Sequence, residues 1–417
     1  MQDNSLVGSV MNTRMLTCIF TGFASGLPYY VLIQLIPAWL RTEGVGLAEI
    51  GLLSLTQLPY TLKFIWAPLL DTFSLKILRL DMGLRRSWMF VTQVVLLMAI
   101  SFLGFLDPTH HLFEITILCI SVAVFSATFD ISIDAFRRQI LPDLELGLGN
   151  SIHVNAYRIS SLIPGSLSLM LADFLSWNFA FVVTSAFFIA GIIMTLFVKE
   201  PQISPQLKET GHSRFTAPFL EFFSRNGMKN SFFILLFMLT YKLGDSMATS
   251  LATPFYIDLG FSLTDIGLVA KNAALWTSII GGILGGIIMI RIGINKALWI
   301  FGFIQIISIL GFAILARVGE NLWLLGAVVG FEYLGVGLGT AAFIAYIAKT
   351  TSKAFAATQF ALFTALTAVP RTTISASSGY IVELMGWEHF FYLCTALAIP
   401  GMVLLLKIAP WDSDSKI

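Results

Sequence analysis

Charged residues are scarce in this chain. Only 12% of its 417 residues are Asp, Glu, Lys or Arg, and 57% are hydrophobic, whereas about 25% of the residues of an ordinary soluble domain are charged. The formal net charge is +1, so the sequence gives no electrostatic reason to expect nucleic acid as a partner. These figures indicate a membrane protein.

Signatures of enzymes and metal sites are also missing. No phosphate-binding loop of the form G-x-x-x-x-G-K-[ST] occurs, so the chain has no visible ATPase of its own. The three cysteines lie inside apolar runs without the spacing of a metal site, and the five histidines are dispersed. These omissions disfavour a membrane-embedded enzyme, and we expect no catalytic residue, no metal and no cofactor.

Long apolar runs are what the sequence does contain. A helix needs about 20 mostly apolar residues to cross a bilayer. Such runs cover 15–39, 48–70, 88–106, 112–136, 148–172 and 177–197, and then 230–256, 263–290, 297–315, 322–346, 355–383 and 388–408. The sequence therefore predicts an all-α membrane protein with six plus six helices.

A polar stretch divides the two sets of runs. We predict an N-terminal six-helix bundle over 1–197, a cytoplasmic linker over 198–229 and a C-terminal six-helix bundle over 230–417. A weak internal repeat supports this division, because PAWLRTEGVGLAEIG in the first half is echoed by PFYIDLGFSLTDIG in the second. Two such halves are typical of transporters that rock about a central site.

Lys and Arg in the connections predict the orientation, since they concentrate on the cytoplasmic side of membrane proteins. With a cytoplasmic N-terminus, the inner connections hold eighteen of these residues and the outer ones hold two, Arg41 and Arg317. Both termini are therefore expected to face the cytoplasm.

Nine charged residues lie deep within the apolar runs. They are Lys63, Arg158, Lys242, Lys271 and Arg371, with the acids Asp130, Asp134, Asp245 and Glu332. Each costs about 2.5–3.5 kcal/mol at the centre of a membrane helix, so each should be paired or face water. The third, sixth, ninth and twelfth runs carry none of them, an uneven distribution that favours one shared polar cavity between the two bundles.

Asp130 and Asp134 are four residues apart and so share a helical face. The fourth and fifth runs are joined by the short turn LPDLELG and should form an antiparallel hairpin, which puts Asp130 level with Arg158 and Asp134 level with His153. We predict that Asp130 is a buried acid held by Arg158. Asp134 should lie nearer the inner surface, where it has either a functional role or a plainer one, pairing with Arg137 or Arg138 one turn later.

The second half offers a pair and a single acid. Lys242 and Asp245 are three residues apart in YKLGD and can neutralise each other, either as a structural pair or as part of a gate or binding site. Glu332 has no basic residue within helical reach, which makes it the best candidate for a protonatable carboxylate. Alternatively, a cation from another helix, such as Lys271 or Arg371, holds it.

Two further cations allow alternatives. Arg371 follows Pro370, which frees backbone carbonyls in the helix, and a guanidinium group there suits a substrate carboxylate or phosphate. Lys63 lies between two prolines. It either stays at membrane depth, or its long side chain extends to the inner headgroups or to Asp71.

Blocks along nearly the whole chain resemble the muropeptide permeases of the AmpG type. In the first half they are FASGLPYYVLIQLIPAWLRTEG, IGLLSLTQLPYTLKFIWAPLLD, FDISIDAFR and YRISSLIPGSLSLMLAD, and in the second YKLGD, DIGLVAK, FAATQFALFTALTAVPR and GWEHFFYL. The resemblance implies the major facilitator fold and proton-driven import of anhydro-muropeptides across the bacterial inner membrane. In that fold the third, sixth, ninth and twelfth helices stand away from the cavity, and these are the four runs without charge.

The resemblance also carries over to single positions. The family's D-x-x-x-D-A segment falls on Asp130 and Asp134, and its Y-R on Tyr157 and Arg158. Phe129 stands where the family usually has Gln, and Gln139 where it often has an acidic residue. These departures bear on the substrate more than on the fold, and related branches carry siderophores or acetyl-CoA.

We therefore expect a secondary active transporter that imports a small anionic amphipathic substrate by proton symport, as a monomer in the lipid of the bacterial inner membrane. The expected proton-coupling residues are Asp130, Asp134, Asp245 and Glu332. The expected substrate-binding residues are Arg158, Lys242, Lys271 and Arg371, with the aromatic residues Tyr29, Tyr30, Tyr157 and Trp276. The alternatives are a siderophore or acyl-CoA permease and, in a different class, a membrane receptor that transports nothing.

Overall fold

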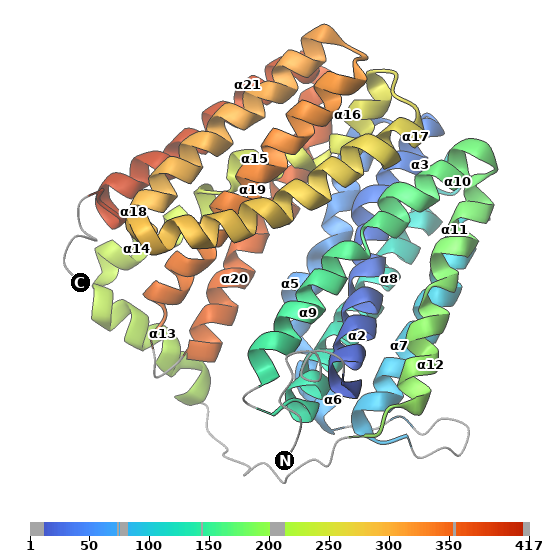
Figure 1. The fold of residues 1–417 in the computed structure, drawn as a ribbon, viewed down its shortest axis with the longest axis horizontal. Helices are drawn as coiled ribbons and strands as arrows, with labels where there is room; N and C mark the ends of the chain where they lie inside the picture. Colours follow the sequence, from blue (N-terminus) through green and yellow to red (C-terminus); the bar gives the residue numbers. More distant parts are fainter. Residues whose placement is uncertain are drawn as a thin grey trace. The chain divides into compact units, whose positions relative to one another are not determined.

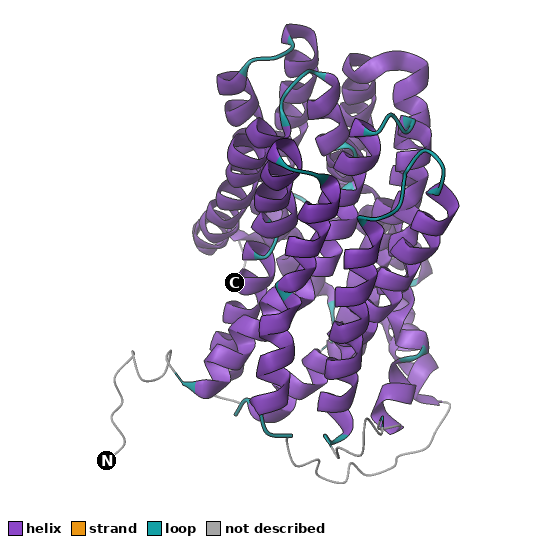
Figure 2. Cartoon of the chain, turned by 90° about the vertical axis from the view of Figure 1, so that its right-hand side faces the viewer, coloured by secondary structure: helices purple, strands orange, loops and turns teal. Residues whose placement is uncertain are grey.

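The computed structural model describes residues 12–72, 75, 82–142, 145–200, 213–352 and 356–411. Over these ranges the regular structure is entirely helical (Figures 1 and 2). Each of the predicted apolar runs is found as a helix or as a series of short helices in line. The prediction of an all-α protein with six plus six helical runs is thus confirmed.

The chain divides into two compact units, and each is described by itself. Unit 1 consists of Met1–Val45 and Thr56–Leu207, and unit 2 consists of Gly46–Leu55 and Lys208–Ile417. The predicted division around a linker over 198–229 stays a prediction, because residues 201–212 lie outside the described ranges.

Unit 1 is built from helices that are often interrupted. In chain order they are α2 (Thr13–Tyr30), a π-helical turn (Val31–Leu35), α3 (Ile36–Thr42), α5 (Leu58–Leu62), a 3-10 turn (Lys63–Ile65), α6 (Ala67–Thr72), α7 (Leu84–Leu103), α8 (Leu112–Ile140), α9 (Leu146–Ile159), a second π-helical turn (Ile163–Leu167), α10 (Ser168–Phe174), α11 (Trp177–Ala186) and α12 (Phe188–Phe197). The helix α2 packs along α9, and α7 packs along α8 (Figure 1).

Unit 2 contains longer helices. It begins with α4 (Leu47–Leu52) and a 3-10 turn that continues it (Leu53–Gln57). After unit 1 it goes on with α13 (Ser213–Asn226), α14 (Met228–Thr240), α15 (Leu243–Ser250), α16 (Ala252–Asp258), α17 (Leu263–Asp265), a π-helical turn (Ile266–Ala270), α18 (Lys271–Val318), α19 (Leu322–Thr350), α20 (Ala356–Thr373), a 3-10 turn (Ser375–Ser377) and α21 (Ser378–Ile408).

Two of these helices contain a sharp turn at a glycine. Gly293 in α18 has φ 78° and ψ 165°, and Gly386 in α21 has φ 78° and ψ 166°. A positive φ is open to glycine and strained for other residues. The turns separate the eighth predicted run from the ninth and the eleventh from the twelfth. The continuous stretch Leu263–Val318, with 56 residues, is accordingly long enough for two crossings.

Helix starts follow from local sequence. Four short polar side chains each accept a hydrogen bond from the backbone N–H three residues later, which satisfies a donor that has no partner inside the helix. They are Asn12 before α2, Ser176 before α11, Ser262 before α17 and Asn321 before α19.

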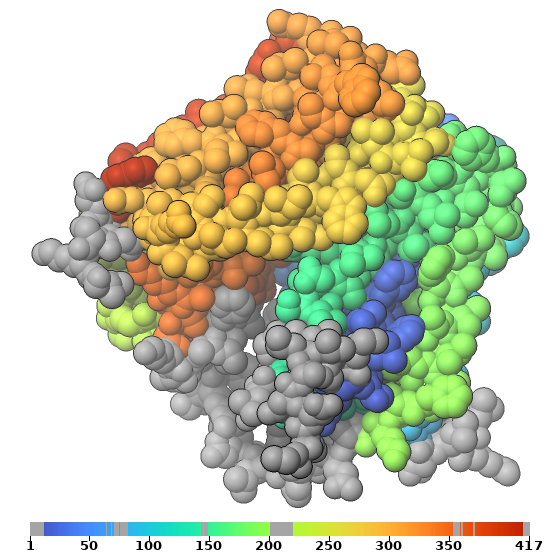
Figure 3. Space-filling model, viewed as in Figure 1, coloured from blue at the N-terminus to red at the C-terminus, as the bar shows by residue number. Residues whose placement is uncertain are grey.

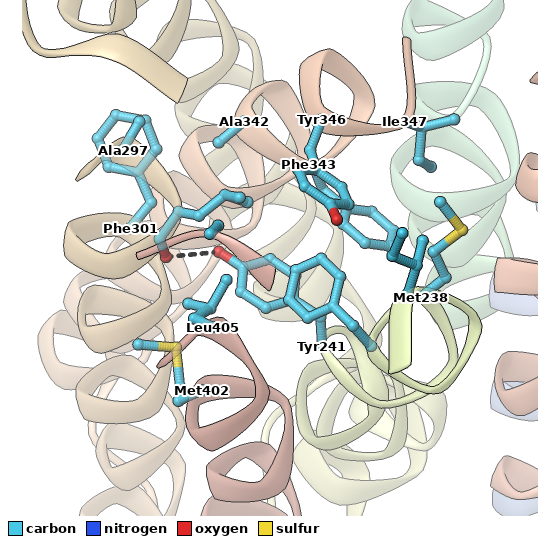
Figure 4. Packing of buried hydrophobic residues seen from close by; sticks show 14 of the residues in the cluster. Met238, Tyr241, Ala297, Phe301, Ala342, Phe343, Tyr346, Ile347, Met402 and Leu405 are labelled. Carbon is cyan, nitrogen blue, oxygen red and sulfur yellow. Dashed lines mark hydrogen bonds between the residues drawn. The ribbon is translucent and has the colours of Figure 1, made fainter. Parts of the chain in front are cut away.

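A cluster of buried aromatic residues holds unit 2 together (Figure 4). Tyr241, at the end of α14, stacks on Phe343 of α19 with ring centroids 5.3 Å apart. Its hydroxyl donates a hydrogen bond to the carbonyl oxygen of Leu298 in α18 at 2.9 Å. Helices in a bilayer associate through such packing and interhelical hydrogen bonds, because lipid supplies no hydrophobic drive between them. These two contacts hold the end of α14, just before Lys242, against α19 and α18.

The outer surface of α18 is apolar. Ile283, Ile287 and Ile290 expose 60%, 52% and 86% of their surface, and Figure 3 shows α18, in yellow to orange, lying open over much of its length. Eight continuous helical stretches within the described ranges are long and apolar enough to cross a membrane. Exposed aliphatic side chains are what such a stretch needs where it meets lipid.

The short segment 46–55 packs closely on α21 and on the end of α20. The N–H of Ala48 donates to Glu383 Oε1 at 3.0 Å, and the hydroxyl of Ser54 donates to the carbonyl of Thr372 at 3.1 Å. Gly379 lies so near the carbonyl oxygen of Leu47 that a Cβ atom would overlap it. The contact is therefore possible only because residue 379 has no side chain.

Replacing Gly379 by Ala should destabilise the protein, because the new methyl group meets backbone and no rotamer change can relieve the overlap. Overpacking of this kind typically costs about 1–3 kcal/mol. We expect a lower midpoint of thermal unfolding in detergent for Gly379→Ala than for the parent protein. The matched control is Gly282→Ala in α18, where a Cβ has no neighbour within 4 Å. Equal midpoints for all three proteins would contradict the close contact.

Candidate functional site

Unit 1 contains a polar cavity of about 400 Å³ between α2, α8 and α9. Its lining is Ser25, Tyr30, Asp130, Asp134, Arg137, His153, Val154, Tyr157 and Arg158. Both aspartates of α8 and the Tyr-Arg pair of α9 thus face one space, as expected for an antiparallel hairpin of these two helices.

Close packing of α2 on α9 positions this lining. A Cβ atom at Gly22 would overlap the backbone of His153, and one at Gly26 would overlap Ser160 and the backbone of Tyr157. Small residues at such spacing let membrane helices approach each other closely. The approach brings the tyrosines that end α2 next to Tyr157.

Asp130 is bound by groups other than the predicted one. Ser25 donates a hydrogen bond to Oδ1 at 2.5 Å, and Lys63 Nζ lies 4.0 Å from Oδ2. The predicted ion pair between Asp130 and Arg158 is wrong, since Arg158 lines the same cavity without reaching the carboxylate. The hairpin register gives the height of Arg158 but not the direction of its side chain. The alternatives for Lys63, headgroups or Asp71, stay predictions, because the side chain of Asp71 lies outside what the structure describes.

Asp134 follows the plainer alternative. Arg137 Nη2 lies 2.8 Å from Asp134 Oδ1, which confirms the pairing one turn along the helix. The other terminal nitrogen of Arg137, Nη1, is buried and has no hydrogen-bond partner among the described residues. His153 is buried beside them, with Nδ1 3.3 Å from the Thr21 hydroxyl oxygen.

Four tyrosines gather at this cavity. The ring of Tyr29 lies 5.5 Å from the rings of Tyr30 and Tyr60 and 6.2 Å from that of Tyr157, and the rings of Tyr30 and Tyr157 are 5.6 Å apart. The structure thus brings together the three tyrosines singled out in the sequence. Tyr60 was missed, although it lies in the same LPYTLK block as Lys63.

Unit 2 holds a separate group of buried polar residues. Lys242 Nζ lies 2.8 Å from Asp245 Oδ2, so the predicted pair forms. Lys242 stands at the break between α14 and α15, with φ −103° and ψ 9°. Glu332 on α19 is 1% exposed, and neither of its carboxyl oxygens has a hydrogen-bond partner within the described part of the chain.

Two other predicted residues, Lys271 and Trp276, are not assembled into either group. Lys271 Nζ donates to the Thr253 hydroxyl oxygen at 2.6 Å, so Lys271 does not hold Glu332. Trp276 exposes 51% of its surface. Arg371 lies in α20, but its side chain is outside what the structure describes. Their roles in substrate binding stay predictions.

Comparison with known proteins identifies the fold and family. The profile of the Major Facilitator Superfamily matches residues 18–375. The crystal structure of a D-xylose-proton symporter has a TM-score of 0.72 at 11% sequence identity and covers 98% of this chain and 99% of its own. At that identity the likeness concerns the fold alone, and it confirms the major facilitator fold.

Two relatives cover nearly the whole chain. An uncharacterized protein of Haemophilus influenzae is 47% identical over 99% of this chain and 98% of its own length. The anhydromuropeptide permease of Escherichia coli K12 is 39% identical over 94% of this chain and 79% of its own length. The protein is therefore a multi-pass membrane transporter and not an enzyme. It belongs to the major facilitator superfamily and, within it, to the family of AmpG-type muropeptide permeases.

Proposed function

We propose that this protein imports anhydro-muropeptides across the bacterial inner membrane by proton symport, as a monomer with both termini in the cytoplasm. The observation that carries the proposal is the unit 1 cavity, in which the guanidinium group of Arg158, with no carboxylate partner among the described residues, lies together with Tyr30 and Tyr157. Family membership supports the substrate class, and the bias of Lys and Arg, eighteen inside against two outside, supports the orientation.

The chemistry of the cavity suits an amino-sugar peptide. Such a substrate combines sugar rings with peptide carboxylates. No carboxylate of the described chain lies within 4 Å of Arg158, which leaves its planar fork of N–H donors available for bidentate pairing with a substrate carboxylate. The rings of Tyr30 and Tyr157 offer apolar faces with polar tips to such a substrate.

The acids at membrane depth are the proposed means of proton coupling. Asp130 and Asp134 lie in the same cavity as Arg158, so a proton on either one changes the charge that a substrate meets there. Asp245 and Glu332 lie inside unit 2, in a group that also contains Lys242. A site with both signs of charge can bind an anion and a proton together without leaving a large net charge in the membrane.

Uptake by purified protein in proteoliposomes tests the proposal. Labelled anhydro-muropeptide should accumulate above the level of empty vesicles under an inward proton gradient, and a protonophore should abolish the accumulation. Uptake of a siderophore or an acyl-CoA in its place would contradict the substrate class. Binding of muropeptide with no transfer into the vesicle would instead identify a receptor.

Replacing Arg158 by Gln should weaken substrate binding, because it removes a charged hydrogen-bond donor from the cavity. Such hydrogen bonds contribute about 1.5–3 kcal/mol, so the apparent KM for uptake should rise about 10- to 100-fold. The matched control is Arg14→Gln in the same unit, whose guanidinium lies 3.1 Å from Glu145 in a largely exposed pair. Exposed pairs contribute little, so the control should keep the parent KM. An unchanged KM in Arg158→Gln would remove Arg158 from the site.

A further inference from the structure

The cavity of unit 1 holds a second arginine that the proposed function does not use. Arg137 lies on α8 and Arg158 on α9, and both belong to the lining of the same space of about 400 Å³. Only 16% of the Arg137 side chain is exposed. Its charge and its hydrogen bonds must therefore be satisfied from within the protein or by a molecule that enters the cavity.

The contact of Arg137 with Asp134 satisfies only part of this group. Arg137 Nη2 donates a hydrogen bond to Asp134 Oδ1 at 2.8 Å, while Arg137 Nη1 is buried and has no hydrogen-bond partner among the described residues. A carboxylate that faces a guanidinium group squarely accepts two parallel hydrogen bonds, one on each oxygen. The pair inside α8 therefore leaves one buried donor without an acceptor, which is costly for a charged group.

Asp134 is a partner that can be displaced. It lies three residues before Arg137 on the same helix, and ion pairs at this spacing are weak. Of its side chain, 53% is exposed, so its carboxylate can stay hydrated when Arg137 takes another partner. Asp130, in the same lining, is 15% exposed and has Ser25 and Lys63 as its partners. Of the two acids, the one beside Arg137 is thus the one that can give way.

The charges around the cavity favour an anion. The lining contains two carboxylates, Asp130 and Asp134, and two guanidinium groups, and Lys63 adds an ammonium group next to Asp130. Among the described residues, three cations therefore face two acids, without His153 in the count. An anionic group that enters this space reduces the excess of positive charge, which is unfavourable away from bulk water.

We propose that Arg137 forms a second carboxylate-binding subsite in the cavity, so that the transporter binds a substrate with two carboxylates, one at Arg158 and one at Arg137. The carboxylate at Arg137 takes the place of Asp134 and accepts hydrogen bonds from both Nη1 and Nη2. The inference rests on the proposed function, because the peptide of a muropeptide supplies the carboxylates. It narrows the substrate class to dianionic peptides, which a single arginine would not select over monoanionic ones.

Binding to purified variants separates this subsite from a purely structural ion pair. Arg137→Gln should raise the Kd for an anhydro-muropeptide about tenfold or more, since it removes charged hydrogen bonds. Asp134→Asn should lower the Kd about two- to fivefold, because it removes a competing carboxylate. Arg138→Gln is the matched control and should keep the parent Kd, since Arg138 is exposed on the same helix and outside the lining. An unchanged Kd in Arg137→Gln, or a higher Kd in both Arg137→Gln and Asp134→Asn, would overturn the subsite.

Amidation of the substrate tests the contact itself. A muropeptide with two peptide carboxylates is compared with its two singly amidated forms. In the parent protein each amidation should raise the Kd about tenfold. In Arg137→Gln one of the two amidations should have no further effect, and in Arg158→Gln the other one. Equal losses from both amidations in Arg137→Gln would show that neither carboxylate is bound by Arg137, which overturns the subsite.

Failure of the subsite is distinguishable from failure of the proposed function. If the parent protein binds muropeptide and Arg137→Gln behaves like Arg138→Gln, only the subsite fails. If the parent protein binds no muropeptide, the proposed function fails, and the dipeptide Ala-Glu, which has two carboxylates, becomes the probe for the same variants. No binding of this dipeptide, or an equal Kd in the parent and Arg137→Gln, then overturns the subsite as well. Should Arg137→Gln not fold, Asp134→Asn decides, and a Kd that is unchanged or higher in it overturns the subsite.

Discussion

The compensation of charge away from water is the constraint on which this structure depends. Lipid offers no hydrogen bonds, so the backbone must be helical wherever it crosses and each ion must find a partner or a cavity. The two units meet this demand differently. Unit 1 keeps Asp130 and Asp134 at the wall of a cavity, with Ser25 and Arg137 as direct partners. Unit 2 closes its acids inside packed side chains, and Glu332 has no hydrogen-bond partner there among the described residues. An open arrangement suits a group that meets a substrate, and a closed one suits a group that holds a proton.

The packing of unit 2 explains why its polar group can be so deeply buried. Tyr241 is stacked on Phe343 and hydrogen-bonded to Leu298, which ties α14, α18 and α19 together one residue before Lys242. The backbone of Lys242 is therefore held in place, and its side chain reaches Asp245 three residues later in the chain. A loose junction at this place would let water reach the Lys242–Asp245 pair and weaken it. The aromatic cluster and the charged group are thus parts of one arrangement.

The fold was predictable from sequence because a membrane-spanning helix is recognised by the apolar composition of about 20 residues. This composition does not depend on how the side chains pack. The turns at Gly293 and Gly386 fall between predicted runs for the same reason.

The partners of Asp130 were not predictable. Pairing by hairpin register places Arg158 at the right height, but the direction of a side chain depends on the neighbouring helices, and Ser25 and Lys63 come from two others. Glu332 was recognisable from the sequence because no basic residue lies within reach of it on its own helix, and this is a local property that a sequence shows.

Breaks in the helices account for a further regularity in where the functional groups stand. Tyr30 ends α2 directly before a π-helical turn, Lys271 directly follows another, Lys63 opens a 3-10 turn, and Lys242 lies at the junction of α14 and α15. Two of the acids are placed otherwise, since Asp130 and Glu332 lie inside the uninterrupted helices α8 and α19, whereas Asp245 lies in the first turn of α15. Irregular turns are common at functional sites in helices, and in transporters they occur where the backbone lines a cavity. A long cationic side chain at such a turn can change its partner with little movement of the backbone, while a short carboxylate on a rigid helix stays in place. Asp130 and Glu332 are therefore held in fixed positions, while a lysine at a helix break can change its ion-pair partner.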